Sequence, residues 1–327
     1  MNSIELVKKT ILGLNESGVT PVYGWVKANL SDMINDKYGS VHNFEDAFGF
    51  DLAHIFGGPQ AFDTPEINRL RDDCAVITPQ MLLDMTLSDP NREEDYAEIK
   101  NELTHQRISR GRFCYVQTWG TFEAVNGIFG IQNHLLYMAL YPDLLGEIYK
   151  RLTPWTLSFI NNIIDLGIDM VHISDDWGAQ NGLLFSPDIW RRMIEPHHRE
   201  MVRAAHERGV LASLHSDGNV NGVLEGIAEI GYDLVHPYQE SAGMDYSYYL
   251  NRYHDQFAIM GGLCVQTAIG FGNPVRLENE IRRLFSLLKN KRWVFCTTHY
   301  VQQHCSMEEL EFAFDLALEL AKKSKRA

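Results

Sequence analysis

VLASLHSDG, residues 210–218, joins a short apolar run to a polar turn and decides the fold class. A continuous apolar run of this kind is typical of a strand buried on both faces of a parallel sheet. Two similar stretches, GIDMVH at 167–172 and GYDLVH at 231–236, each place a glycine before such a run. The echo fits repeated βα units and also fits convergent loop chemistry, and both interpretations favour a parallel α/β fold.

Short apolar runs alternate with longer helical patterns along most of the chain, which is typical of βαβ units. The chain has a suitable length for one α/β barrel, and no linker or low-complexity stretch divides it. We therefore predict one α/β domain over residues 1–327, a (β/α)8 TIM barrel with an N-terminal helical extension. Residues 1–110 give weaker signals: a helix, a strand at Thr20–Trp25 and a glycine-containing segment at Phe48–Gln60. The other predicted strands are Phe113–Gln117, Met170–Ile173, Val210–Leu214, Asp233–His236, Phe257–Met260 and Trp293–Cys296.

The helices between these runs have recognisable start signals. SPD at 186–188 combines an N-cap, a proline at the first helical position and an acid near the positive helix end. This helix is predicted to continue to about Glu207 and to end at Gly209. Further helices should start at 141–143, at 273–274 and at the capping box that begins with Ser306.

Composition narrows the class of protein. A formal net charge of -14 argues against a nucleic-acid partner, because the protein surface repels phosphate. The five cysteines are odd in number and show no C-x-x-C spacing, so a secreted disulfide scaffold is not expected. The charged N-terminus does not resemble a signal peptide, and no apolar run is long enough for a membrane span. We expect a soluble, cytoplasmic protein.

Polar and aromatic residues follow six of the predicted strands. Catalytic groups of α/β barrels lie at the carboxyl ends of the strands, so these residues should face one ligand cavity. The residues expected to bind substrate there are Trp119, Asp175, Trp177, Tyr238, Gln239, Glu240 and Tyr300.

His215 and Asp217 stand two residues apart after one strand, so both side chains can point to the same side. His299 follows another strand and can reach the same mouth when the barrel closes. An N, O, N ligand set with an open position predicts a catalytic zinc site at His215, Asp217 and His299. The alternative is that Asp217 caps the next helix and His215 hydrogen-bonds to the backbone.

The adjacent acids Asp175 and Asp176 point in different directions, so at most one of them faces the cavity. One is a candidate general acid or base, or an acceptor for substrate, and we assign the catalytic role to Asp176. The alternative is that both cap the loop.

Five other histidines are predicted to be structural. His172 and His236 lie within strands and are expected to fill the core. The helical histidines are expected at the surface; they are His197, His198 and His206.

Five pieces in this order resemble the uroporphyrinogen decarboxylase superfamily, and within it the branch of corrinoid-dependent methyltransferases. The resemblance is strongest from residue 167 to 302. The pieces are DDWGAQNGLLFSPDIWRRMIEPHH at 175–198, HSDGN at 215–219, the strand before His236-Pro237, the glycines at 261–262, and TTHYVQ at 297–302. The resemblance implies a (β/α)8 barrel with its site at the carboxyl ends of the strands.

Methyltransferases of this branch are similar in binding zinc through a His-x-Cys turn and a later cysteine. Here the histidine corresponds to His215, whereas Asp217 and His299 occupy the positions of the two thiolates. A set without thiolates is harder and makes zinc a stronger Lewis acid, which suits an ether oxygen better than sulfur. The resemblance then implies an O-demethylating methyltransferase with a small-molecule methyl donor and a partner protein that carries the corrinoid cofactor. Zinc could instead be absent, with His215 and Asp217 acting through hydrogen bonds.

Two other functions stay open. A uroporphyrinogen-type decarboxylase acts without a cofactor, but its arginine-rich RQAGR-like stretch corresponds here to PVYGWVK at 21–27. A non-catalytic ligand-binding barrel is the third interpretation. Aromatic side chains at the strand ends fit an aryl ether, a corrinoid face or a quaternary ammonium group. The oligomeric state is open, and a homo-oligomer is compatible with the sequence.

Overall fold

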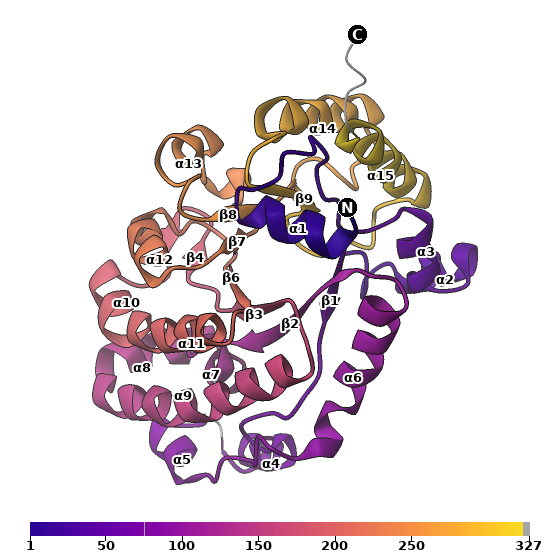
Figure 1. Cartoon of the computed structure of the whole chain (residues 1–327). Helices are drawn as coiled ribbons and strands as arrows, with labels where there is room; N and C mark the ends of the chain where they lie inside the picture. The colour runs from indigo at the N-terminus through magenta and orange to yellow at the C-terminus, as the bar shows by residue number, and fades with distance from the viewer. Residues whose placement is uncertain (75, 323–327) are drawn as a thin grey trace.

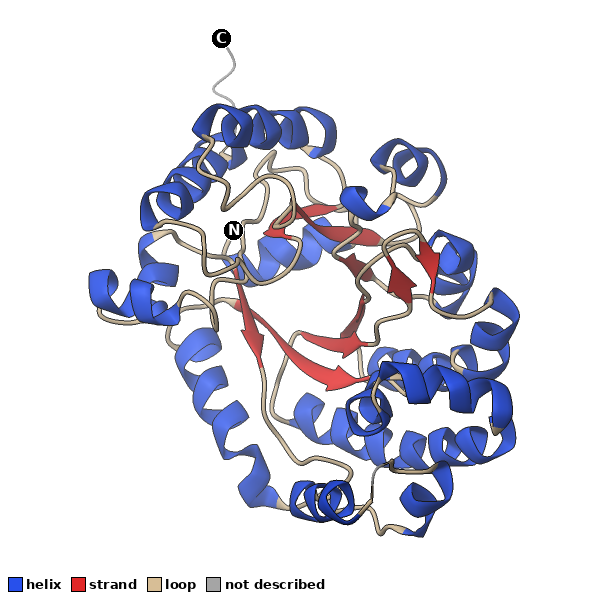
Figure 2. Cartoon of the chain, turned by 180° about the vertical axis from the view of Figure 1, so that it is seen from behind, coloured by secondary structure: helices blue, strands red, loops and turns tan. Residues whose placement is uncertain are grey.

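A parallel sheet forms the centre of the computed structural model, which describes residues 1–74 and 76–322. Its seven strands follow the order β1-β2-β3-β6-β7-β8-β9, and every neighbouring pair is parallel. The sheet curls into a ring with helices outside it (Figure 2). The strands are β1 Leu52–Ile55, β2 Phe113–Trp119, β3 Met170–Ser174, β6 Leu211–His215, β7 Leu234–His236, β8 Ala258–Leu263 and β9 Trp293–Thr297, and the small hairpin is β4 Gly178–Ala179 with β5 Gly182–Leu183.

A short segment connects the two edges of this sheet. Pro21 accepts a hydrogen bond from the Phe295 amide of β9, and Tyr23 donates one to the Phe295 carbonyl. On the other side Val22 accepts from the amide of Asp51, just before β1. The strand predicted at Thr20–Trp25 is thus reduced to an isolated bridge at Val22. The observed fold is a curled, seven-stranded sheet of TIM-barrel type, and the predicted eighth strand is wrong as a strand.

Helices surround the sheet and also cover its amino end (Figure 1). The side chain of Ser3 in α1 donates a 2.6 Å hydrogen bond to Asp51, which places α1 where the strands begin. The carboxyl ends of the strands lie at the opposite end and carry the polar residues. The helices are α1 Ser3–Ile11, α2 Ser31–Tyr38, α3 Val41–Ala47, α4 Thr64–Asp73, α5 Pro79–Asp84, α6 Ala97–Leu103, α7 Glu123–Phe129, α8 Ile131–Leu140, α9 Pro142–Asp165, α10 Pro187–Met193, α11 Glu195–Glu207, α12 Leu224–Ile230, α13 Tyr246–Arg252, α14 Pro274–Leu288 and α15 Met307–Ala321. None of these described helices is long and apolar enough to cross a membrane.

The helix predicted from 186 to about Glu207 is two helices. The Ser186 side chain caps α10 as expected, accepting from the Ile189 amide. The helix stops at Met193 because Pro196 lacks an amide hydrogen and its ring clashes with the preceding turn. The next helix, α11, begins at Glu195, directly after Ile194.

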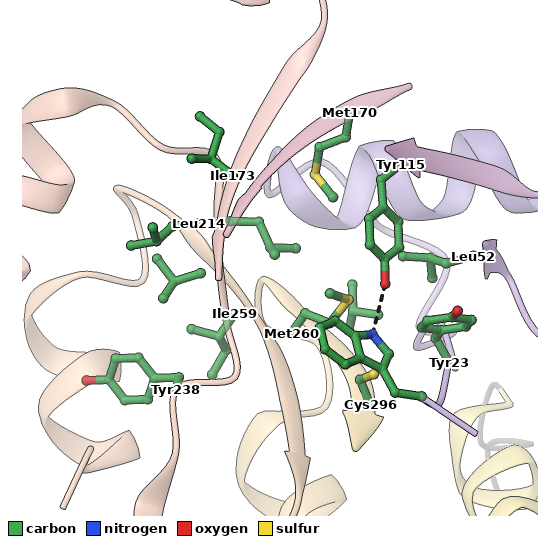
Figure 3. Packing of buried hydrophobic residues seen from close by; sticks show 14 of the residues in the cluster. Tyr23, Leu52, Tyr115, Met170, Ile173, Leu214, Tyr238, Ile259, Met260 and Cys296 are labelled. Carbon is green, nitrogen blue, oxygen red and sulfur yellow. Dashed lines mark hydrogen bonds between the residues drawn. The ribbon is translucent and has the colours of Figure 1, made fainter. Parts of the chain in front are cut away.

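Aromatic side chains fill the inside of the ring below the strand ends. Trp25 is buried and donates a 3.0 Å hydrogen bond from its indole nitrogen to the Tyr115 hydroxyl, drawn as a dashed line in Figure 3. Its ring stacks on His236 with 4.4 Å between ring centroids. This packing closes the interior, so a ligand has access to the polar groups from the carboxyl end.

Candidate active site

One row of residues crosses the sheet at its carboxyl end. Trp119 of β2 pairs with Ser174 of β3, Ser174 pairs with His215 of β6, and His215 pairs with His236 of β7. Parallel register brings residues that are distant in sequence to the same level. The turn after β6 and the loop after β9 complete the mouth around this row.

The predicted metal ligands His215, Asp217 and His299 lie together in the structure. Nε2 of His215 is 3.8 Å from one Asp217 oxygen, and Nε2 of His299 is 3.8 Å from the other. One donor atom from each residue lies within 4.8 Å of the other two. The Asp217 Oδ1 atom is buried and has no hydrogen-bond partner among the described residues. These donors fit one metal ion, because an ion at their centre would satisfy that oxygen.

A relay of hydrogen bonds sets the tautomer of His215. The Thr297 carbonyl only accepts, so Nε2 of His236 donates to it over 3.2 Å. In a neutral ring Nδ1 of His236 then accepts from Nδ1 of His215, 2.8 Å away. Burial lowers the pKa of His236 well below its usual value, which keeps that ring neutral. In the tautomer of His215 that donates from Nδ1, Nε2 has a free lone pair facing the carboxylates, as a metal ligand requires.

Asp176 is the acid of the 175–176 pair that faces the mouth. Its Oδ1 accepts a 2.8 Å hydrogen bond from the Asp217 amide and lies 3.7 Å from Nε2 of His215. Burial, together with the charge of Asp176, raises the pKa of Asp217, and nearby His215 offsets part of this shift. The negative charges of these two carboxylates repel each other, and a metal ion or a proton between them would reduce that repulsion.

Asp175 is fully buried and does not face the mouth, contrary to its predicted role in binding substrate. Its carboxylate accepts from the amide of Glu123 at 2.6 Å, the indole of Trp177 at 2.8 Å and a ring nitrogen of His198 at 2.8 Å. Trp177 is equally buried, so it has no surface to offer a ligand. The surface prediction for His198 is wrong: the ring is buried and its other nitrogen bonds to the Tyr232 hydroxyl.

The other predicted substrate residues are divided among three places. Trp119 is 42% exposed at the end of β2, and the ring of Tyr300 packs on Trp25 at 5.1 Å. Tyr238 and Gln239 are buried, and neither lines the cavity at the end of β2. Glu240 forms an ion pair with Arg283 at the outer surface.

Two inner histidines behave as predicted in being core residues. His172 bonds through Nδ1 to Ser213 at 2.7 Å, whereas its Nε2 has no partner among the described residues. His172, His215 and His236 form a second group with ligand-like spacing. His215 turns Nδ1 toward this inner group and Nε2 toward the mouth, so it belongs to both.

A cavity of about 370 Å³ opens beside the row at the end of β2. It lies between α4, α7, α9 and the loop after β1. Of its lining residues, only Trp119 was predicted from the sequence to bind substrate. The other lining residues that matter chemically are Phe62, Arg71, Gln117, Thr118, Glu123, Trp155, Thr156 and Phe159.

Glu123 lines the cavity and lies close to the acids of the mouth. It stands at the start of α7, and burial together with the negative charge of Asp176 and Asp175 raises its pKa to about 7. A carboxyl group with this pKa is protonated about half of the time near neutral pH and can donate a proton. Its position in the first helical turn after a strand end was a signal available in the sequence.

The family model for uroporphyrinogen decarboxylase (URO-D) matches residues 119–320, and the chain belongs to this family. The match includes the mouth residues and the end of β2. Such membership indicates an enzyme built on this barrel-type fold.

Curated relatives carry the name of this family, and solved structures share the fold. A uroporphyrinogen decarboxylase of Salinispora tropica is 28% identical over 162 residues, which are 47% of this chain and 40% of that protein. One from Pelobacter propionicus is 22% identical over 156 residues, 46% of this chain and 41% of that protein. The chain thus matches about two fifths of the length of these relatives. A methyltransferase from Methanosarcina mazei has a TM-score of 0.68 at 12% identity and covers 98% of this chain and 99% of its own. A sugar phosphate isomerase/epimerase from Parabacteroides distasonis has a TM-score of 0.50 at 10% identity, covering 94% and 98%.

Proposed function

We propose that the protein is a metal-assisted methyltransferase that moves a methyl group from a small O-methyl compound to a corrinoid protein. The observation that supports this most is the convergence of His215, Asp217 and His299 on one point at the mouth. Its donors are two ring nitrogens and a carboxylate, which suit zinc. The fold of a methyltransferase from Methanosarcina mazei is similar over nearly the whole chain.

Each residue of the mouth has a role in this reaction. A zinc ion held by His215, Asp217 and His299 would act as a Lewis acid toward the ether oxygen. His236 keeps the Nε2 lone pair of His215 available through the hydrogen bond between their Nδ1 atoms. Asp176 fixes the turn that carries Asp217 by accepting from its backbone amide.

Glu123 supplies the proton that the leaving group needs. When the methyl carbon–oxygen bond breaks, its electron pair stays on the oxygen, and the carboxyl proton of Glu123 neutralises the alkoxide. The methyl group passes to the reduced corrinoid, which contributes the electron pair of the new bond. Methyl ether, proton and reduced corrinoid thus give an alcohol and a methylated corrinoid.

Decarboxylation of a porphyrinogen is the second candidate, because the curated relatives bear that name. A substrate with many carboxylates needs cationic partners. The mouth instead carries Asp176, Asp217 and nearby Glu123. Among the described residues that line the cavity, Arg71 is the one arginine or lysine. These charges favour the methyltransferase.

The test is methylation of cob(I)alamin, followed by absorbance, with purified protein and a panel of small methyl ethers. We expect methylcobalamin to form with a subset of donors, activity to disappear after chelation, and zinc to restore it. Turnover of uroporphyrinogen, measured in parallel, would establish the decarboxylase. If no donor methylates the corrinoid free or on a partner protein, the proposal fails. Full activity of protein that contains no stoichiometric metal would show that the reaction does not depend on zinc.

Glu123 should make stability depend on pH. Its folded pKa of about 7 lies above the unfolded value, so the stability it contributes is complete below about 4.5 and is lost as pH rises through 7. Glutamine does not ionise, so the free energy of unfolding of Glu123→Gln should rise relative to that of wild type when the pH increases from 5 to 8. After a discount for partial exposure, the expected rise is about 1–2 kcal/mol. Urea unfolding of metal-free protein at both pH values measures this. Glu200→Gln, at an exposed acid of α11, is the control; a gain of equal size there would contradict the assignment to Glu123.

A further inference from the structure

The cavity at the end of β2 is outside the metal ligand set but next to it. Trp119, which lines it, belongs to the same sheet row as His215, two strands away, or about 10 Å at ordinary strand spacing. Glu123 lines the cavity and lies close enough to Asp176 for that charge to raise its pKa. A molecule in the cavity can therefore extend a substituent toward the mouth.

The walls of the cavity are flat and aromatic. Trp155 and Phe159 stand one turn apart on α9 with their rings 8° from parallel. The Trp155 indole is fixed by a 2.9 Å hydrogen bond to the Ser88 carbonyl, which holds the ring in place without a ligand. Trp119 and Phe62 add further aromatic surface. Rigid rings of this kind favour a planar, apolar ligand body.

The polar groups of the cavity stand at different heights along α7. Glu123 begins this helix, and the Arg71 guanidinium donates a 2.6 Å hydrogen bond to the carbonyl of Gly127, four residues later. Four residues of helix rise about 6 Å, which is the separation of para substituents on one benzene ring. The other hydrogen bond of Arg71, of 3.4 Å, goes to the neutral Asn68 side chain, and no carboxylate among the described residues pairs with Arg71, so its charge is available to an anion.

We propose that this cavity binds the methyl donor, and that the donor is a monocyclic aromatic methyl ether with one anionic group para to the ether oxygen. The anionic group lies at Arg71 and the ether oxygen at Glu123, facing the mouth. The volume of about 370 Å³ is at the small end of ligand pockets, about 300–1,000 Å³, and suits a single ring. This inference rests on the proposed function, of which it specifies the substrate class.

Binding of three probes tests the site without any turnover: 4-methoxybenzoate, its neutral amide 4-methoxybenzamide, and the cationic 4-methoxybenzylamine. Calorimetry measures affinity, and quenching of tryptophan fluorescence reports contact with Trp119 and Trp155. We expect the benzoate to bind most tightly. Arg71→Gln should weaken the benzoate roughly tenfold and leave the amide nearly unchanged, because only the charged hydrogen bonds are lost.

The second variant is designed to fill the cavity with a side chain. A Cβ at Gly127 meets nothing within 4 Å, so Gly127→Phe can place a ring at the cavity wall without a backbone clash. Gly146→Phe is the matched control, since Gly146 is also helical and open but does not line the cavity. We expect Gly127→Phe to abolish binding of benzoate and amide, and Gly146→Phe to retain both.

The outcomes separate this inference from the proposed function. Lack of binding of all three probes to wild type, or benzoate binding that survives Gly127→Phe, overturns the cavity as the donor site. Equal affinity for benzoate and amide overturns the inference that the donor carries an anionic group bound by Arg71. Probe binding with the expected variant effects supports the site even if no corrinoid is methylated, and in that case only the methyl-transfer proposal fails.

Discussion

Asp175→Ala is expected to lower the free energy of unfolding by about 3–5 kcal/mol, the largest stability loss of any single change in the site. The carboxylate is fully buried and accepts from an indole, a histidine ring and the Glu123 amide. Its removal leaves these buried donors without an acceptor. Asp175→Asn should lose less, about 1–3 kcal/mol, because one oxygen still accepts. Urea unfolding monitored by circular dichroism measures both.

Gly120 allows an independent test of the same network. A Cβ added there would lie 2.3 Å from Cγ of Asp175, so Gly120→Ala must displace the carboxylate. We expect a loss of about 1–3 kcal/mol, as for other overpacked sites. Gly127→Ala is the matched control, since its Cβ meets open space within a helix. Losses below 1 kcal/mol in both Asp175→Ala and Gly120→Ala would show that the network does not hold β3, α7 and α11 together.

From the strand ends, the sequence correctly predicted that His215, Asp217 and His299 lie together. Each apolar run predicted from residue 113 onward is a strand in the structure, and the bounds differ by at most one residue at the start and three at the end. Because the seven strands of the main sheet are parallel, the residues that follow β6 and β9 lie at the same end of the sheet, which brings His215 and His299 together. Whether they hold a metal stays a prediction. The N-terminal part was harder, since β1 at Leu52–Ile55 is four residues long and contains a histidine.

Three features could not be found from strand ends alone. Trp25 reaches the centre of the ring from an irregular segment, so no periodicity pointed to it. The cavity combines residues near 60, 120 and 155, whose proximity depends on how α4, α7 and α9 pack. His198 was different, because it begins the buried stripe of α11 with Met201, Val202 and Ala205. That i, i+3, i+4, i+7 spacing was visible in the sequence and argued for burial.

His215→Ala should reduce methyl transfer about a thousandfold, because a Lewis acid at the ether oxygen supplies several kcal/mol of transition-state stabilisation. Nε2 of His215, the proposed ligand atom, lies near both carboxylates of the mouth, 3.7 Å from Asp176 and 3.8 Å from Asp217. Bound zinc should fall from one per chain to background. His304→Ala, at an exposed histidine, should change neither quantity and serves as the control.

His236→Phe separates direct ligation from the relay behind it. Phenylalanine can keep the stacking on Trp25 but cannot accept from Nδ1 of His215, so the tautomer of that ligand is no longer fixed. Zinc affinity should fall roughly 10–100-fold, as is usual when a residue that hydrogen-bonds to a metal ligand is lost. The rate at saturating zinc should fall less than in His215→Ala. Competition with a chelator measures the zinc affinity, and initial rates at saturating zinc measure methyl transfer by the zinc-loaded variant. If His236→Phe binds zinc as tightly as wild type, Thr297 and His236 do not set the protonation of the ligand. If it fails to bind zinc at any concentration although it remains folded, the inner histidines themselves hold the metal, and the site lies deeper than His215, Asp217 and His299.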